Sequence, residues 1–239
     1  MVRSRPDAPV PGPFRGFPDS SGRFFLELAL HNDRDWFQAH RAEYVDGWAE
    51  PMGALLAEVR DRIAGAYGRL SLALPKVFRI HRDVRFSKDK SPYKTHVAGL
   101  VALEPATGRE PAEPPAAIYF HVGVDERFAG TGLWTMAPET LRRFRAAIAD
   151  PRRGTELARH LAPLLERGFT LSAPETLRRV PAGVDPDHPR GHLLRMKGLV
   201  VAPPEVPRRL LTKPALVEWL ADQARAAAPV AIWLARHAA

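Results

Sequence analysis

Cationic side chains gather in one stretch of the sequence, between Arg79 and His96, where they outnumber carboxylates by six to two. Those cations are Arg79, Arg82, Arg85, Lys88, Lys90 and Lys94. An arginine guanidinium is a planar fork of donors that matches carboxylate and phosphate oxygens, and a lysine adds a compact charge. Four of the six lysines lie between Lys76 and Lys94, although the chain otherwise uses arginine. The stretch therefore predicts a site for a phosphate or carboxylate group.

The residues of this predicted site have different roles. Arginines would clamp the anionic group, lysines would act as point charges, a tyrosine hydroxyl would donate, and Asp83 would orient an arginine. In an enzyme, Asp83 or a lysine of lowered pKa would be the base, and the arginines would stabilise developing negative charge. The predicted ligand-binding residues are Arg79, Arg82, Asp83, Arg85, Lys90, Tyr93 and Lys94.

Three hypotheses about function follow from these charges. The first is a pocket for a phosphorylated or carboxylated small molecule, and the second is a nucleic-acid-binding module that contacts phosphates. The third is a structural network of ion pairs, with function in partner binding. The chain has no nucleophile elbow, Walker loop, dinucleotide fingerprint or metal motif, so no reaction is assigned and no cofactor is expected. We favour the first hypothesis and leave open whether the chain is an enzyme.

The same stretch alternates apolar and polar residues in the manner of a strand. The apolar positions of one parity are Phe78, Ile80, Val84 and Phe86. A period of two is typical of a half-buried strand, so we expect a strand over residues 76–86. It should end at Ser87, because turn residues follow and Pro92 favours an extended residue before it. Arg82 interrupts the apolar parity, so we expect it to be partly buried and paired with a carboxylate, such as Asp83 or Asp89, or with a carbonyl.

Several segments together resemble a widespread bacterial family of uncharacterised, conserved hypothetical proteins. The resemblance rests on the pattern RxxRDxRF..DKxxY from Arg79 to Tyr93 and on the upstream run Asn32-Asp33-Arg34-Asp35-Trp36-Phe37. A glycine-rich stretch, 130–134, and a later basic segment, 177–183, are similar to those of the family and extend the match over residues 23–225. Thr131 and Ala182 depart from the family's pattern. The family is a domain of unknown function, so the resemblance implies no activity.

Length and composition favour one hydrophobic core. The chain has 239 residues, of which 45% are hydrophobic, enough to bury a substantial interior. We expect a disordered, Pro-rich tail over residues 1–19 and a single domain over 20–239. Neither a membrane-spanning run nor a secretory signal is present, so we expect a cytoplasmic protein with no membrane partner. The net charge of +8 favours an anionic small molecule as the partner, with nucleic acid as the alternative.

The remaining patterns predict an α+β fold. Helical spacing of apolar residues is found near both ends of the chain, with Asp33 as an N-cap and a last helix that ends before Pro229. Loosely alternating segments at 95–104 and 116–124 favour an antiparallel meander. We therefore expect an antiparallel sheet built around residues 76–124, with the N- and C-terminal helices packed against one face.

Two further groups of residues have the composition of binding sites. His81, His96 and His121 fall on predicted strands, where imidazoles can converge on zinc, but their spacing matches no metal motif, so we expect no metal site. Gly130 and Gly132 lie before a predicted helix, and amides there could contact a phosphate. The basic segment 178–192 is expected to form an irregular wall or lid.

Overall fold

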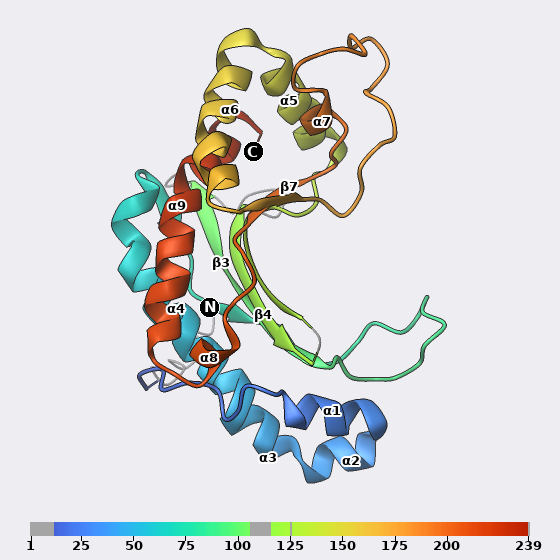
Figure 1. Cartoon of the computed structure of the whole chain (residues 1–239). Coiled ribbons are helices and arrows are strands. Elements are labelled where there is room, and N and C mark those ends of the chain that lie inside the picture. Colours follow the sequence, from blue (N-terminus) through green and yellow to red (C-terminus); the bar gives the residue numbers. More distant parts are fainter. Residues whose placement is uncertain (1–11, 106–115, 125, 239) are drawn as a thin grey trace, which may run out of the picture.

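The computed structural model describes residues 12–105, 116–124 and 126–238. An antiparallel sheet lies at its centre, with helices at one face and at both ends (Figure 1). Its α-helices are α1 (Arg23–Leu30), α2 (Arg34–Ala39), α3 (Arg41–Tyr44), α4 (Glu50–Ile63), α5 (Pro138–Ala149), α6 (Pro151–Glu166), α7 (Gly191–Leu194), α8 (Arg208–Leu211) and α9 (Ala215–His237). Its strands are β1 (Leu70–Leu72), β2 (Lys76–Val77), β3 (His96–Pro105), β4 (Ala117–Gly123), β5 (Arg127–Leu133), β6 (Thr170–Ser172) and β7 (Leu199–Ala202).

The sheet has the order β1-β3-β4-β5-β7-β6, and β2 also pairs with β3. Its central strands alternate in burial, as the sequence pattern requires. Val97 pairs with Val122 and Val101 with Ile118, and these side chains point into the core. The α+β class and the antiparallel meander are thus confirmed.

Helices α4 and α9 cover one face of the sheet. They pack side by side and contact β3 and β5, respectively (Figure 1). The Tyr67 hydroxyl donates a hydrogen bond of 2.8 Å to the Ala224 carbonyl, which ties the turn after α4 to α9. Among the described elements, no helix lies over the middle of the opposite face (Figure 1). Side chains on that face are therefore available for a ligand.

Helix α9 continues through Pro229, contrary to the predicted end before that residue. A proline inside a helix removes a backbone hydrogen bond, and packing of the last turns compensates here. Trp233 is 1% exposed, and its indole N–H donates a hydrogen bond of 3.0 Å to the Arg153 carbonyl. The predicted N-cap was correct, because the Asp33 carboxylate accepts the Trp36 N–H at 2.9 Å.

The N-terminal segment is ordered further toward the N-terminus than predicted. Phe14 and Phe17 are buried, and the Phe17 ring stacks on Trp48 with 5.3 Å between centroids. The Phe17 N–H donates to the Leu211 carbonyl at 2.8 Å. Residues 12–19 therefore belong to the fold, and residues 1–11 of the predicted tail lie outside the described part of the chain.

The strand predicted over 76–86 is wrong for most of its length. The ladder with β3 ends at Val77, followed by one further hydrogen bond of 2.8 Å from the Phe78 N–H to the Ala98 carbonyl. The rest of residues 78–95, which we call the arm, leaves the sheet (Figure 1). The two limbs of the arm bond to each other instead, through the Arg82 N–H to the Pro92 carbonyl and the Lys94 N–H to the Ile80 carbonyl, both at 2.8 Å. Phe86 is 95% exposed, so the apolar parity does not mark a buried face there.

The glycine stretch is also not a turn before a helix. Gly130 and Gly132 lie in β5, and α5 begins only at Pro138. The backbone of this stretch pairs with β4 on one side and with β7 on the other. The glycines allow the neighbouring strands to pack closely. Their backbone is part of the sheet, so this stretch offers no free turn for a phosphate.

Candidate functional site

The arm holds all seven predicted ligand-binding residues, and both of its carboxylates pair with arginines of the arm. Arg82 pairs with Asp89, and its side chain is 28% exposed, which confirms the expected partial burial and carboxylate partner. Arg85 pairs with Asp83 at 2.6 Å, although its side chain is 75% exposed. The Lys90 ammonium donates to the Val84 carbonyl at 3.0 Å. These contacts fix the turn of the arm.

The carboxylates of the arm respond to these contacts. Hydrogen bonds from the Ser91 hydroxyl and N–H, and then from Arg82, hold the pKa of Asp89 well below its usual range. Hydrogen bonds from Arg85 likewise lower the pKa of Asp83. An acidic group of lowered pKa is a poor proton acceptor at neutral pH. The predicted role of Asp83 as a base therefore has no support in this geometry.

Tyr93 lies in the core and not on the cationic surface. Its ring is 4% exposed and stacks on Phe37, with 4.2 Å between centroids. The side chain of Asn32 accepts the Tyr93 N–H and donates to the Tyr93 carbonyl, each at 3.0 Å. The tyrosine therefore anchors the arm to the N-terminal helices.

Lys94 and Arg79 lie at the base of the arm, next to the open face of the sheet. The Lys94 ammonium donates to the Arg79 carbonyl at 3.2 Å and sits 5.8 Å from the centre of the Phe78 ring. Lys76 approaches the same ring at 5.9 Å. Burial, and then the charge of Arg79, lower the pKa of Lys94. An anion would relieve this repulsion, because it favours the charged ammonium.

Phe78 joins these cations to a cavity of about 520 Å³ on the open face, which we call the sheet-face cavity. Its lining combines aromatic and small side chains with a few polar groups, and its glycines leave room above β5. The residues that line it are Phe78, Leu100, Ala117, Tyr119, His121, Glu126, Phe128, Gly130, Gly132, Leu133, Trp134, Thr135, Ser172 and Val200. A volume of this size, with few convergent polar groups, is typical of small-molecule sites.

A row of polar side chains crosses one end of the sheet-face cavity. Tyr119 and His121 are two residues apart on β4 and therefore point to the same face. The Tyr119 hydroxyl lies 3.1 Å from His121 Nδ1, and Glu126 Oε2 lies 3.4 Å from His121 Nε2. His96, on the neighbouring strand, has its ring centre 5.3 Å from that of His121. Both imidazoles have a lowered pKa, mainly because of burial.

The three histidines considered for zinc do not meet. His81 lies at the base of the arm, where its ring is 5.2 Å from that of Tyr93. Only His96 and His121 are neighbours. Among the residues described, no three side chains of histidine, cysteine or acidic type are arranged to hold a metal ion.

The basic segment 178–192 does not approach the arm. It extends beside α5 and α7, at the other end of the sheet (Figure 1). Within it, the Arg190 guanidinium donates to the Ile148 carbonyl at 2.8 Å. Its charges are therefore separate from those at Lys94.

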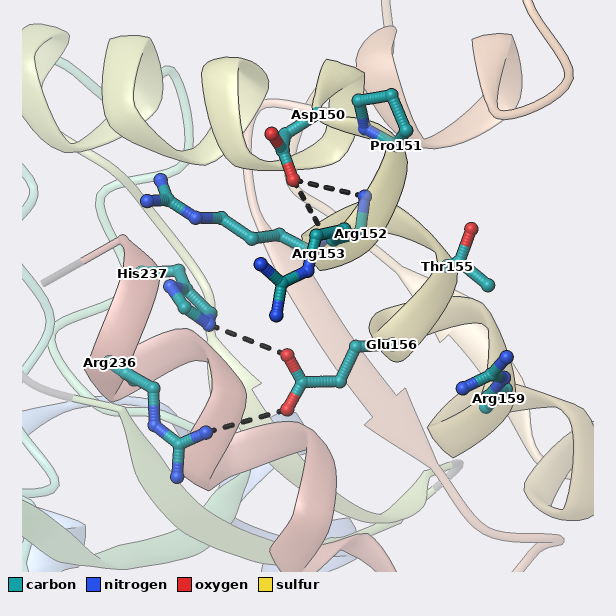
Figure 2. A pocket seen from close by; sticks show the side chains of 9 residues that line it. All are labelled: Asp150, Pro151, Arg152, Arg153, Thr155, Glu156, Arg159, Arg236 and His237. Atoms are coloured by element: carbon teal, nitrogen blue, oxygen red, sulfur yellow. Dashed lines mark hydrogen bonds and ion pairs between the residues drawn. The ribbon is translucent and has the colours of Figure 1, made fainter.

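A second, larger cavity of about 770 Å³ lies between the start of α6 and the end of α9 (Figure 2). It is rich in arginine and also contains two carboxylates. Asp150 accepts the backbone N–H groups of Arg152 and Arg153, and Glu156 lies 3.4 Å from Arg236 and 3.6 Å from His237. An anion there would compete with Glu156 for Arg236 and His237.

Sequence reasoning missed the cavity, although one signal pointed to it. Tyr119 and His121 share a parity on β4, and Phe128 and Gly130 share one on β5, as same-face residues must. The sequence alone marks His121 only as a potential metal ligand. These residues come together through the pairing of β4 with β5, and the sequence alone does not show which strands pair.

Fold and site together define an α+β protein with a cavity on the open face of an antiparallel sheet. The sequence model of one family, described as conserved hypothetical protein (DUF2461), matches residues 21–233. The chain belongs to this family, as the resemblance predicted. Curated proteins and solved structures give no match. None of the described helices is long and apolar enough to span a membrane.

The histidines of the site predict a dependence of stability on pH. Burial, with the charges of His121 and Lys94, lowers the pKa of His96 to about 4, and Glu126 partly opposes this. A histidine in the unfolded chain has a pKa of about 6.5. Between about pH 6.5 and pH 4, this histidine is therefore protonated in the unfolded chain, whereas His96 in the folded protein stays neutral. Stability is therefore lost as the pH falls through this window. In urea titrations, wild type should lose about 1–2 kcal/mol more than His96→Gln between pH 7 and pH 4, a figure discounted for partial exposure. Parallel curves for the two proteins would contradict this.

Proposed function

We propose that the protein binds a small organic anion in the sheet-face cavity. The anionic group, a phosphate or carboxylate, lies toward Lys94 and Lys76. The apolar part of the molecule contacts the aromatic side chains that line the cavity. The observation that carries the proposal is the position of Phe78, whose ring lines the cavity and is approached by both ammonium groups. Groups that can bind an anion therefore lie next to groups that can bind the apolar part of a ligand.

The contacts of the arm separate this proposal from its alternatives. Arg82 and Arg85 already pair with carboxylates of the arm, so for these residues the contacts favour a structural ion-pair role. A nucleic-acid surface needs cations spread along a backbone, and this pairing leaves fewer of them available. Lys94 is different, because its ammonium contacts the Arg79 carbonyl and the Phe78 ring and not a carboxylate of the arm. It is the better candidate for a ligand contact.

Thermal shift with simple probes tests the proposal. Phenyl phosphate and benzoate supply an aromatic body and an anionic group, and inorganic phosphate at matched ionic strength supplies the anion alone. A ligand at ten times its Kd adds about 1.4 kcal/mol to stability, which corresponds to a rise in Tm of about 3–6 °C. We expect a larger rise with phenyl phosphate than with inorganic phosphate.

Two lysine variants of the same arm provide the comparison. Lys94→Gln should lose most of the rise in Tm. Lys88→Gln should retain it, because Lys88 is exposed and is not one of the lysines that approach the Phe78 ring. If both variants keep the full response, the anion binds elsewhere. If the aromatic anions stabilise no more than inorganic phosphate does, the cavity is not the site.

A further inference from the structure

The polar row at the end of the sheet-face cavity has the connectivity of a proton-transfer chain. A carboxylate, an imidazole and a hydroxyl follow one another, with 3.4 Å from Glu126 Oε2 to His121 Nε2 and 3.1 Å from His121 Nδ1 to the Tyr119 hydroxyl. All three residues line the cavity. The backbone places them there, because β4 carries two of them and the Gly123 N–H closes the turn onto the Glu126 carbonyl at 2.9 Å.

The partners of the imidazole select its tautomer. A carboxylate only accepts hydrogen bonds, so His121 Nε2 carries the proton that faces Glu126. In the neutral ring the other nitrogen is then a bare acceptor. His121 Nδ1 therefore accepts the Tyr119 O–H, which is the arrangement in which a carboxylate orients an imidazole as a base.

We propose that Tyr119 is a catalytic proton acceptor of the cavity, that His121 receives its proton, and that Glu126 positions the imidazole. As an O–H group of the bound molecule gives its proton to the Tyr119 oxygen, the Tyr119 proton moves to His121 Nδ1. The products are a deprotonated substrate oxygen and an imidazolium that faces the Glu126 carboxylate. One proton leaves the substrate, one reaches the histidine, and no other reactant is consumed.

The position of the lysines defines the class of substrate. The proposal rests on the proposed function, since Lys94 and Lys76 hold the anionic group beside Phe78, whose ring lies 6.3 Å from that of Tyr119. In a molecule bound there, the atoms that reach the Tyr119 hydroxyl are those close to the anionic group of the molecule. The substrate class is therefore an anion with a nearby hydroxyl, such as a hydroxy acid or a phosphorylated alcohol.

The environment keeps the chain neutral until a substrate arrives. Burial raises the pKa of Tyr119 to about 12, so the hydroxyl does not ionise by itself near neutral pH. Burial also lowers the pKa of His121, which leaves Nδ1 free to accept. The other groups that face this imidazole are His96 on β3 and Phe128 on β5. In the described structure, neither of them forms a hydrogen bond with the Tyr119 hydroxyl, which bonds to His121.

A neutral electrophile tests the chain without a known substrate. With benzenesulfonyl fluoride, the Tyr119 oxygen would form a bond to sulfur, the S–F bond would break, fluoride would leave, and the phenolic proton would pass to His121. Mass spectrometry of peptides locates the product and gives its rate. The other tyrosines, Tyr44, Tyr67 and Tyr93, are at most 6% exposed, so they should remain unmodified.

Three variants separate reactivity from simple exposure. His121→Gln should slow labelling of Tyr119 at least tenfold, and Glu126→Gln, whose side chain is 79% exposed and tolerates change, should slow it about threefold or more. His96→Gln should label at nearly the wild-type rate. Folding of each variant is checked by its Tm. Equal rates in wild type, His121→Gln and Glu126→Gln, or no labelling of Tyr119 at all, would overturn the proposal.

A charged probe separates failure of this inference from failure of the proposed function. 4-(Fluorosulfonyl)benzoate adds a carboxylate, so Lys94→Gln should slow its reaction with Tyr119 and leave that of the neutral probe unchanged. A response to His121→Gln without a response to Lys94→Gln supports the proton chain and rejects the anion site. Nitrogen NMR of labelled histidine adds a direct check: His121 should be the Nε2–H tautomer, and an Nδ1–H tautomer would overturn the proposal.

Discussion

Gly132→Ala should be among the most destabilising single substitutions in this protein, with a loss of about 3–5 kcal/mol or complete unfolding. Gly132 has φ +147, a conformation that other residues rarely adopt. An added Cβ would lie 2.1 Å from the Leu199 carbonyl oxygen, which belongs to the backbone of β7 and cannot move alone. Backbone strain and overpacking each cost about 1–3 kcal/mol, and both act here. Urea titration of the variant measures the loss as a lower midpoint.

Gly68→Ala is the matched control for this prediction. Gly68 also has a positive φ, +63, but nothing lies within 4 Å of the position that its Cβ would take. Its substitution carries the conformational cost alone, about 1–2 kcal/mol. If the two variants lost equal stability, crowding between β5 and β7 would not be the cause. If both retained wild-type midpoints, the backbone at Gly132 would differ from the one described.

The sheet could be predicted in part because its central strands carry their own signal. Residues of β3 and β4 alternate between core and open face, so their type and antiparallel pairing follow from sequence. The segment after Val77 has the same alternation without the same structure. Alternation with a period of two shows which residues share a face of a strand, but not what covers that face. The arm extends into solvent, and Phe86 is exposed there. Beyond Phe78, the two limbs of the arm pair with each other and not with the sheet, so the alternation does not place Phe86 in the core.

The candidate site was predicted even less completely, for a related reason. Lys94, at the base of the arm, is predicted from the sequence because several cations lie close together there. The cavity beside them is made by side chains from several strands, and the register between strands sets which of these meet. Tyr119 and His121 face Glu126 only because β4 and β5 are joined by a short turn. The sequence therefore predicts cations beside the sheet-face cavity but not the residues that line it.

Tyr93 illustrates the same limit, because its position among cations predicts a role in ligand binding. Its ring packs on Phe37 and its backbone is held by Asn32, contacts that connect the arm to the N-terminal helices. A buried aromatic ring contributes through its area and packing, and a hydroxyl that binds a ligand contributes through one donor. The two roles respond differently to truncation of the ring and to removal of the hydroxyl alone.

Tyr93→Ala should therefore destabilise the protein by about 3–5 kcal/mol, the usual cost of removing a buried aromatic ring. Tyr93→Phe keeps the ring, so it should lose less than about 1 kcal/mol and retain the wild-type rise in Tm with phenyl phosphate. Urea titration measures the first effect, and thermal shift measures the second. A Phe variant that folds normally but loses the response to phenyl phosphate would return Tyr93 to the ligand site. An Ala variant of wild-type stability would show that the ring is not part of the core, and that the arm is held by the Asn32 contacts alone.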